Sequence, residues 1–458
     1  MSKDWAMCLN PLNPFFGIFA RYAEKIAMIC EKPYTYREIY TQIASTQLRE
    51  IQARSVVALV GDYSAEYIAN LFALCAKKCI IAPILPRNMD FEIGKFGVEY
   101  ILQNGQITQC KHESHALLKN LNNANQSGLI LFSSGSTGNP KAVLHNFDTM
   151  LESYANKAQN PTTTISAFLP DHIAGIDVLL SVFGSGGTLV IPKSRNPQDM
   201  LYAMQNYKVE ILPASPTLLR LLLMSEIDKF DLSALKLVVY GSEKMSDSLL
   251  CALREKLPHT KFKQSFGTSE TNAIKTKSLP NSDYFKFISV DYKIIDNELY
   301  LKSKTQALGY LNADNSAFDS DGYFATGDLV ESIRVNGEEY LRILGRSKEV
   351  INVGGEKVLP QEVENVILQM PFIKDCLVFG EFNAITGQSV SVKIVLEDSQ
   401  IAEFFGIDSP TNIEIKKELR KFCKGKLAPF KIPSKVERVE SLEISERFKK
   451  IRKGGKNG

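Results

Sequence analysis

Short strand-like runs alternate with helical patterns between residues 187 and 266, and this alternation is the clearest architectural signal of the chain. Four runs predict strands, at 188–191, 209–212, 235–240 and 261–265. Three segments predict the helices between them, at 197–206, from the Ser215 cap and Pro216 onward, and at 246–257. Such alternation predicts a parallel sheet with helices on its faces, and ligands usually bind such sheets at the carboxyl ends of the strands.

The pattern changes after about residue 290. Residues 292–295 and 299–302 are strand-like and flank an Asp296–Asn297 turn. They predict a hairpin, so an antiparallel element is expected to follow the parallel sheet.

A smaller α+β unit is predicted beyond Gly345. Its first helix, over 360–370, carries apolar residues at i, i+3, i+4 and i+7. Pro371 ends that helix because proline has no N–H to donate. Further elements are predicted downstream: strands at 376–379 and 390–396 and a basic helix over 414–424.

These patterns predict an α/β protein with a large multi-sheet N-terminal domain that contains parallel βαβ units. A small α+β C-terminal domain follows it after a short hinge. We place the large domain at residues 1–345 and the small one at 346–458. The length of 458 residues suits this division, since a domain typically spans roughly 150 residues.

Composition and charge exclude several other classes. Lys and Arg number 54 against 51 Asp and Glu, so bulk charge does not predict nucleic-acid binding. No apolar run approaches the ~18 residues of a membrane helix, and the start lacks a signal-peptide core, so we expect a cytoplasmic protein without a membrane span. The eight scattered cysteines predict reduced core thiols, and His112 and His115, without partners at ligand spacing, predict surface histidines.

A predicted strand at 129–132 runs into a segment rich in glycine and hydroxyl side chains. Two glycines let backbone N–H groups turn inward as an anion nest, four hydroxyls add donors, and Lys141 adds a positive charge. Asn139 and Pro140 precede the lysine, so the segment does not match a Walker A loop. It predicts a polyphosphate site formed by Ser133, Ser134, Gly135, Ser136, Thr137, Gly138 and Lys141.

Residues 133–141 resemble a motif of the adenylate-forming superfamily, which includes acyl-CoA synthetases, aryl-CoA ligases, luciferase and adenylation domains. Further motifs follow in the family's order, and the resemblance spans nearly the whole chain. It implies that the protein uses ATP and Mg²⁺ to convert a small-molecule carboxylic acid to an acyl-adenylate, with release of pyrophosphate. It also implies transfer of the acyl group to a thiol, with coenzyme A as the expected acceptor.

Residues 264–270 resemble the family's aromatic-Gly-x-Thr-Glu motif, with Ser269 in place of Thr. The resemblance implies that Phe266 stacks on adenine and that Ser269 contacts phosphate. It also makes Glu270 the Mg²⁺ ligand, a role that suits carboxylate oxygens. Three more residues of the nucleotide site come from this motif and from residues 231–243, which resemble a segment lining the adenine and acyl pockets: Gly267, Gly241 and Ser242.

Residues 323–329 resemble the next motif, whose aspartate, here Asp328, accepts hydrogen bonds from the ribose diol. Residues 344–351 resemble the segment in which Arg346 contacts the nucleotide. In the same segment the resemblance makes Lys348 the hinge between the two domains.

The Gly354–Gly355 segment resembles a loop that swings toward the thiol-binding tunnel, where glycines allow close approach of a pantetheine arm. An ordinary turn ahead of the next helix also explains these glycines. Residues 447–453 resemble the family's final motif, which makes Lys450 the catalytic lysine of adenylation, with Lys449 or a solvated basic tail as alternatives. The expected catalytic residues are thus Lys450, Glu270 and Lys141.

Residues 168–175 lie where family members place an aromatic residue or His at the mouth of the acyl pocket. His172 is therefore expected either to gate that pocket or to be a structural histidine. The position where amino-acid-activating members carry Asp falls on Ile173, which would leave an ammonium group unpaired. We therefore expect acyl or aryl acids rather than α-amino acids, with Asp177 as the alternative partner for an ammonium group.

Two other functions fit the same motifs. An adenylation enzyme would load an acyl or aryl carrier protein instead of coenzyme A. A nucleotide-binding regulatory protein would keep the scaffold without turnover, and the altered final motif favours that alternative. A homodimer is expected only because such dimers are common among soluble proteins.

Overall fold

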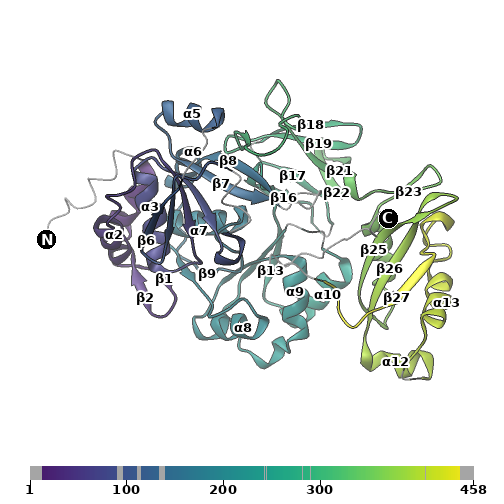
Figure 1. Ribbon diagram of the computed structural model, residues 1–458. Helices are drawn as coiled ribbons and strands as arrows, with labels where there is room; N and C mark the ends of the chain where they lie inside the picture. The colour runs from purple at the N-terminus through teal and green to yellow at the C-terminus, as the bar shows by residue number, and fades with distance from the viewer. Residues whose placement is uncertain are drawn as a thin grey trace.

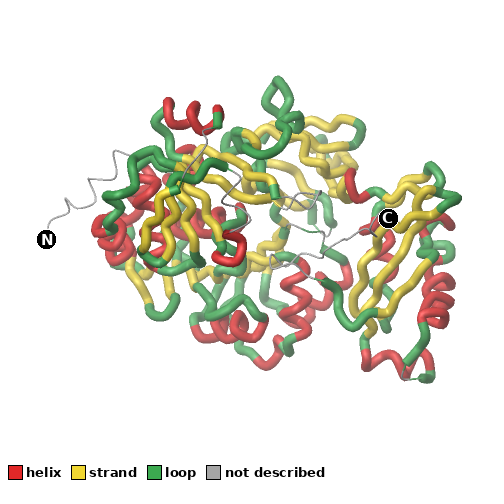
Figure 2. The backbone as a smooth tube through the Cα atoms, viewed as in Figure 1, coloured by secondary structure: helices red, strands yellow, loops and turns green. Residues whose placement is uncertain are grey.

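The computed structural model describes residues 13–89, 96–110, 115–133, 140–241, 243, 245–280, 282–288, 290–407 and 409–443. Two seven-stranded sheets and a six-stranded sheet form a large body, and a five-stranded sheet lies at the opposite end of the molecule from α2 and α3 (Figure 1). Helices and strands are mixed throughout the large body (Figure 2). This architecture confirms the predicted fold class.

The parallel sheet predicted between residues 187 and 266 is present, with strand order β13-β12-β11-β9-β10-β1-β2. Neighbours from β13 to β1 pair in parallel, and β2 is antiparallel at the edge. Its strands are β1 (Ile26–Ile29), β2 (Pro33–Thr35), β9 (Thr163–Ile165), β10 (Thr188–Val190), β11 (Ile211–Ala214), β12 (Leu237–Tyr240) and β13 (Lys261–Gln264).

The helices of this sheet confirm the predicted βαβ pattern. They are α7 (Ile173–Ser185), α8 (Pro197–Asn206), α9 (Pro216–Met224) and α10 (Asp247–Lys256). Ser215 caps α9, since its side chain accepts a hydrogen bond from the N–H of Leu218 at 3.1 Å. The strand predicted at 209–212 begins two residues later, at Ile211, because the N–H of Val209 still bonds to the carbonyl of Met204 at the end of α8.

The second seven-stranded sheet has the order β20-β8-β7-β4-β3-β5-β6. Its strands are β3 (Val56–Val60), β4 (Ile80–Ile84), β5 (Tyr100–Gln103), β6 (Gln106–Gln109), β7 (Gly128–Ser133), β8 (Lys141–Asn146) and β20 (Gly309–Tyr310). Helices α1 (Gly17–Arg21), α2 (Tyr36–Ser45), α3 (Ala65–Ala76), α5 (Ala116–Asn123) and α6 (Phe147–Ala155) accompany it. Side chains of α3, α6 and α7 pack with strands of both sheets, so the two sheets share one core.

The antiparallel sheet has the order β16-β17-β22-β21-β19-β18. Its strands are β16 (Thr276–Ser278), β17 (Phe285–Phe287), β18 (Asp291–Ile295), β19 (Glu298–Lys302), β21 (Phe324–Val335) and β22 (Glu338–Arg346), and β14 (Phe266–Thr268) pairs with β15 (Asn272–Ile274) beside it. The predicted hairpin is β18–β19, in which Asp296 and Asn297 take φ values of 51° and 64°. Positive φ at both turn positions matches the twist of the paired strands.

A C-terminal unit, residues 351–438, contains the five-stranded sheet β24-β23-β26-β25 with β27 beside β26. Its strands are β23 (Ile351–Val353), β24 (Glu356–Val358), β25 (Ile373–Asn383), β26 (Gly387–Leu396) and β27 (Lys435–Arg438). Its helices are α11 (Pro360–Ile367), α12 (Asp398–Phe405) and α13 (Asn412–Cys423). Helix α11 ends three residues before the predicted end at Met370, because the N–H of that residue bonds to the carbonyl of Ile367 in a turn.

Several expectations about side chains can also be compared with the structure. The described cysteines are free, as predicted, and four of the seven are buried. His115 is partly buried and caps α5 instead of lying free on the surface, and His112 lies outside the described residues. Along the described part of the chain, no helix is both long and apolar enough to cross a membrane.

Candidate functional site

The predicted phosphate segment begins and ends in paired strands. Ser133 at the end of β7 pairs with Lys141 at the start of β8, so the two ends of the loop lie side by side. The Lys141 ammonium lies 4.3 Å from the centre of the Tyr310 ring. The loop residues themselves lie outside the described residues: Ser134, Gly135, Ser136, Thr137 and Gly138.

Glu270 lies in the turn between β14 and β15, and neighbouring elements hold this turn in place. The carbonyl of Ser269 accepts a hydrogen bond from Nε2 of His145 at 2.8 Å, and the carbonyl of Glu270 accepts one from the N–H of Ala307 at 2.7 Å. Tyr310 donates to Oε1 of Glu270 at 2.8 Å. Glu270 and Lys141, which are far apart in the sequence, therefore both contact Tyr310.

Two glycines allow close approach of backbone segments near this turn. A Cβ on Gly267 would lie 2.6 Å from the carbonyl oxygen of Asn272 across the β14–β15 hairpin. A Cβ on Gly241 would lie 2.5 Å from Oγ of Ser265. Gly241 follows β12 and Ser265 follows β13, so both lie at the carboxyl ends of parallel strands, and Ser242 lies outside the described residues.

The Phe266 ring is buried in an aromatic cluster. It stacks on Phe285 with ring centres 6.0 Å apart and meets the edge of Phe287 at 5.4 Å. Only 9% of the residue is exposed. Adenine stacking on Phe266 therefore stays a prediction that depends on its remaining exposed edge.

Asp328 and Arg346 lie directly opposite each other in the β21–β22 ladder. Nε of Arg346 lies 2.7 Å from Oδ1 of Asp328, and its Nη1 donates to the carbonyl of Thr326 at 2.9 Å. Burial raises the pKa of Asp328 to about 6, although Arg346 lowers it, and the negative charge of Glu270 adds to the increase. Asp328, Arg346 and Glu270 thus form one electrostatically coupled group.

His172 caps helix α7. Its Nδ1 accepts a hydrogen bond from the N–H of Ala174 at 3.2 Å, and its ring stacks on Phe168 with centres 6.0 Å apart. This arrangement supports the structural alternative for His172, and its gating role stays a prediction. Ile173 is also buried, at 6% exposure, while Asp177 accepts a hydrogen bond from the hydroxyl of Tyr154.

The last predicted residues lie at or beyond the junction with the C-terminal unit. Lys348 lies in a short 3-10 helix, Ser347–Glu349, between β22 and β23. Gly354 and Gly355 form the exposed β23–β24 turn at φ values of 60° and 95°, and a Cβ on Gly355 would meet no atom within 4 Å. Lys449 and Lys450 lie outside the described residues.

Two family models match this chain. The model of the AMP-binding enzyme family matches residues 99–311, and that of the AMP-binding enzyme C-terminal domain matches residues 362–449. The two matches follow each other in the order that the motifs predict. This chain belongs to the adenylate-forming superfamily.

Curated relatives in the adenylate-forming superfamily match at modest identity. A plipastatin synthase of Bacillus subtilis is 23% identical, over 95% of this chain and 19% of that protein. 4-Coumarate–CoA ligase 4 of Arabidopsis thaliana is 29% identical, over 54% of this chain and 49% of its own length. 2-Succinylbenzoate–CoA ligase of Staphylococcus epidermidis is 29% identical, over 71% and 68% respectively. The match thus covers less than two thirds of the first two relatives.

Solved structures of the superfamily share this fold. The anthranilate CoA ligase AuaEII, in complex with anthranoyl-AMP, has a TM-score of 0.76 at 19% identity, covering 96% of this chain and 95% of that one. The o-succinylbenzoate CoA synthetase of Bacillus subtilis, in complex with its acyl-adenylate, has a TM-score of 0.73 at 21% identity, covering 98% and 99%.

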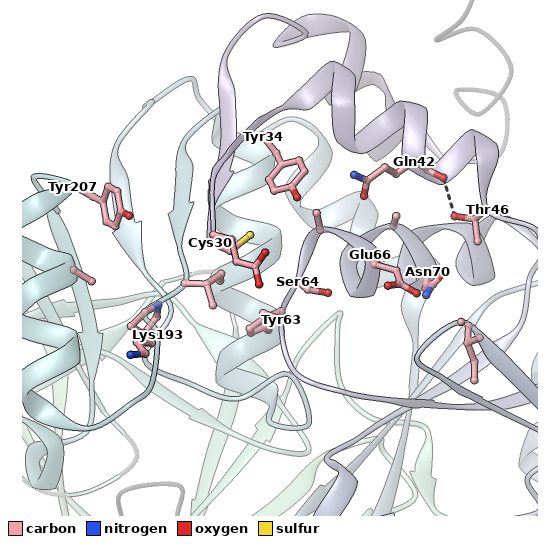
Figure 3. A pocket seen from close by; sticks show the side chains of 18 of the residues that line it. Cys30, Tyr34, Gln42, Thr46, Tyr63, Ser64, Glu66, Asn70, Lys193 and Tyr207 are labelled. Atoms are coloured by element: carbon pink, nitrogen blue, oxygen red, sulfur yellow. Dashed lines mark hydrogen bonds between the residues drawn. The ribbon is translucent and has the colours of Figure 1, made fainter.

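The sequence motifs do not include three residues that support this site: Tyr310, Asn312 and His145. They lie in segments without periodic pattern or family motif, and only the pairing of β20 with β8 brings Tyr310 to Lys141. A groove of about 990 Å³ lies elsewhere, with Tyr34, Asn70 and Tyr207 among its lining residues (Figure 3). Among the described residues, none of the predicted site residues lines this groove.

Proposed function

We propose that this protein uses ATP to convert a carboxylic acid to an acyl-adenylate, releases pyrophosphate, and then transfers the acyl group to the thiol of coenzyme A. The observation that carries this proposal is the meeting of Glu270 and Lys141 on Tyr310, at the end of the predicted phosphate segment. The coupled Asp328–Arg346 pair lies close enough for the Glu270 charge to affect it. Three of the relatives and neighbours described above are CoA ligases or synthetases by name.

In this proposal the residues act by positioning and by charge, because such a transfer needs little covalent chemistry from the protein. A carboxylate oxygen of the acid attacks the α-phosphorus of ATP, and the bond to pyrophosphate breaks. Lys141 and the 133–138 segment hold the departing phosphates, Asp328 accepts from the ribose, and Arg346 lies beside it. Phe266, Gly267, Ser269, Gly241 and Ser242 form the rest of the nucleotide site.

The residues present fit a magnesium ion that is held mainly by the nucleotide. Across the described residues, no group of three or more His, Cys, Asp or Glu side chains could hold a metal by itself. Mg²⁺ commonly binds through one or two carboxylates together with substrate phosphates and water, so Glu270 is a sufficient protein ligand. When bound, the ion neutralises charge that develops on the phosphates.

The final lysine is proposed to act only in adenylation. Lys450 supplies positive charge to the reacting carboxylate and α-phosphate, and Lys449 is the alternative. Lys450→Ala is expected to slow adenylation at least 100-fold and to leave thiol transfer from a preformed adenylate nearly unchanged. Lys449→Ala is the matched control, and a larger adenylation defect in this variant would reassign the role.

For the second half-reaction we propose that a small domain, residues 346–458, rotates about Lys348 relative to residues 1–345. Supporting this division, β22 ends at Arg346 and the separate C-terminal sheet begins at Ile351. Rotation would bring the exposed Gly354–Gly355 turn to the thiol.

The acid is proposed to be an acyl or aryl acid. Ile173, at the start of α7, is buried and apolar, and cannot pair with an ammonium group. Asp177, one turn later, is a poor substitute because it already accepts a hydrogen bond from Tyr154 and lies near the positive charge of Lys157. α-Amino acids are therefore disfavoured.

A carrier protein is the second candidate acceptor. Beside the Gly354–Gly355 turn, the β25–β26 turn exposes Phe382 and Ile385 at 84% and 94%. Such apolar side chains suit contact with a protein partner. Homodimerisation and a cytoplasmic location remain predictions.

The test measures carboxylate-dependent pyrophosphate release from ATP across fatty, aryl, dicarboxylic and amino acids, each with and without coenzyme A or a carrier protein. Release with one acid class supports adenylation, and the acceptor that accelerates turnover identifies the thiol. Glu270→Gln should abolish release, whereas Glu339→Gln, which alters a carboxylate bonded to Tyr292 at 2.6 Å in the six-stranded sheet, should not. Silence with every acid, from protein that binds ATP, would favour a non-catalytic nucleotide-binding protein.

A further inference from the structure

Tyr310 contacts two predicted site residues that come from distant parts of the chain. Its hydroxyl donates to Oε1 of Glu270 at 2.8 Å, and the Lys141 ammonium lies 4.3 Å from its ring centre. Only 3% of Tyr310 is exposed. One buried side chain therefore connects the proposed metal ligand with the proposed phosphate-binding cation.

The position of Tyr310 is fixed by its own surroundings. Its N–H donates to Oδ1 of Asn315 at 2.6 Å, and Nδ2 of Asn315 donates back to its carbonyl at 3.1 Å. Its ring meets the Phe318 ring edge-on with centres 5.5 Å apart. Tyr310 is thus held independently of Glu270, so it can determine where that carboxylate lies.

The segment that carries Tyr310 also holds the end of the phosphate loop. Oδ1 of Asn312 accepts a hydrogen bond from the N–H of Ala142 at 2.7 Å, and its Nδ2 donates to the carbonyl of Pro140 at 3.0 Å. The N–H of Leu311 donates to the carbonyl of Ala142 at 2.9 Å. The loop end and the Glu270 turn are therefore attached to the same short strand.

We propose that Tyr310 is a positioning residue of the nucleotide site: its hydroxyl orients Glu270 toward a divalent cation on the nucleotide phosphates, and its ring positions the Lys141 ammonium. One hydrogen bond leaves the carboxylate with further lone pairs for a cation. The aromatic face attracts the ammonium through the negative charge of its π system. This inference rests on the proposed function.

The protonation state of Tyr310 agrees with its role as a donor. Burial, together with the negative charge of Glu270, raises the pKa of Tyr310 well above its ordinary value. The hydroxyl therefore keeps its proton throughout the working pH range and donates to the carboxylate.

The test is calorimetric titration of ATP into the full-length protein, once with excess Mg²⁺ and once with EDTA. Tyr310→Phe keeps the ring and removes the hydroxyl, so we expect about tenfold weaker binding with Mg²⁺, in line with the loss of a hydrogen bond to a charged group. Binding in EDTA should change less than twofold. Tyr310→Phe should cause no further loss when added to Glu270→Gln, because both variants act through the same carboxylate.

Tyr310→Leu, which also removes the ring beside Lys141, should weaken binding about fivefold in EDTA as well. Tyr292→Phe is the matched control, because it removes a tyrosine–glutamate hydrogen bond of 2.6 Å far from the site. Equal weakening with and without Mg²⁺, or a fall in unfolding temperature alone, would overturn the proposal. Since the readout is binding, failure of every acid to release pyrophosphate would count against the proposed function only.

Discussion

Asp328 combines burial with a partner of opposite charge, and its protonation should control nucleotide binding near neutral pH. Its pKa is raised to about 6, so the carboxylate is ionised at pH 7.5 and mostly protonated at pH 5. A protonated carboxyl accepts hydrogen bonds from a ribose diol less well. We therefore expect adenosine, which has no phosphate to titrate, to bind about tenfold more weakly at pH 5 than at pH 7.5.

Asp328→Asn supplies the control for this prediction. The variant should bind adenosine weakly at both pH values, because its amide does not titrate in this range. The same tenfold fall in the variant would show that another group causes the pH dependence.

His145 is fully buried beside the Glu270 turn and should make the protein sensitive to acid. Burial lowers the pKa of His145 to about 4, below its ordinary value near 6.5, so the folded protein keeps this ring neutral. The unfolded chain binds a proton below pH 6.5, and the contribution to stability is lost as the pH falls from there toward 4. Between pH 7.5 and 5 this should cost about 2 kcal/mol of the free energy of unfolding.

Urea unfolding of the wild type and His145→Gln at both pH values measures this effect. Glutamine can still donate to the carbonyl of Ser269 but does not titrate, so the variant should lose about 2 kcal/mol less on acidification. His259→Gln changes an exposed histidine and should behave as the wild type. Equal losses in all three proteins would assign the acid sensitivity to other groups.

Among the helices and strands, the β23–β24 turn is the part whose conformation depends most clearly on glycine. Gly355 has a φ of 95° and open space around its Cα, so Gly355→Ala introduces strain but no clash. We expect a stability loss of about 1 kcal/mol. If the turn reaches the thiol, the variant should also slow acyl transfer from a preformed adenylate about tenfold, and adenylation should not change.

Gly425→Ala is a matched control within the same unit. Gly425 has a φ of 82°, and a Cβ there would meet no atom within 4 Å, so the strain is similar and the location is different. Both variants should lose similar stability in thermal unfolding, and only Gly355→Ala should slow thiol transfer. Equal slowing in both would assign the effect to stability.

The elements also show how far the sequence predicts this fold. The βαβ units between 187 and 266 are predictable because their apolar period and their caps, such as Ser215, are local signals. The predicted helix α11 is three residues too long, since the apolar period continues to Met370 after the helical bonds stop. The two-residue strand β20 has no such signal, because its pairing with β8 depends on contacts across 165 residues or more of sequence.

Site residues follow the same rule. Glu270, Asp328 and Arg346 lie in contiguous motifs and can be selected from the sequence, and the structure pairs Asp328 with Arg346 at 2.7 Å. Tyr310 cannot be selected in this way, because it is recognisable only through its contacts with Lys141 and Glu270. Local chemistry is therefore readable from the sequence, and the contacts that position it are not.

Across the molecule as a whole, Arg220 of helix α9 joins the large body to the C-terminal unit. Its Nη1 donates to the carbonyl of Lys374 at 3.0 Å, and its Nε lies 3.7 Å from Oδ1 of Asp375 in β25. At the junction itself, Gly345 admits Gln361 of α11 so closely that a Cβ would lie 2.4 Å from Oε1. These contacts hold the arrangement in which the Gly354–Gly355 turn is exposed.

Rotation of the C-terminal unit about Lys348 would have to break the Arg220 contacts. A partly buried ion pair and a hydrogen bond from a charged donor are together worth about 1–2 kcal/mol, which is roughly a fivefold to thirtyfold bias in a two-state equilibrium. Arg220→Ala should therefore raise the rate of thiol transfer relative to adenylation at least threefold in single-turnover measurements. Arg37→Ala, which breaks an ion pair to Glu24 within the large body, should leave this ratio unchanged. An unchanged ratio in Arg220→Ala would mean that these contacts do not limit the rotation.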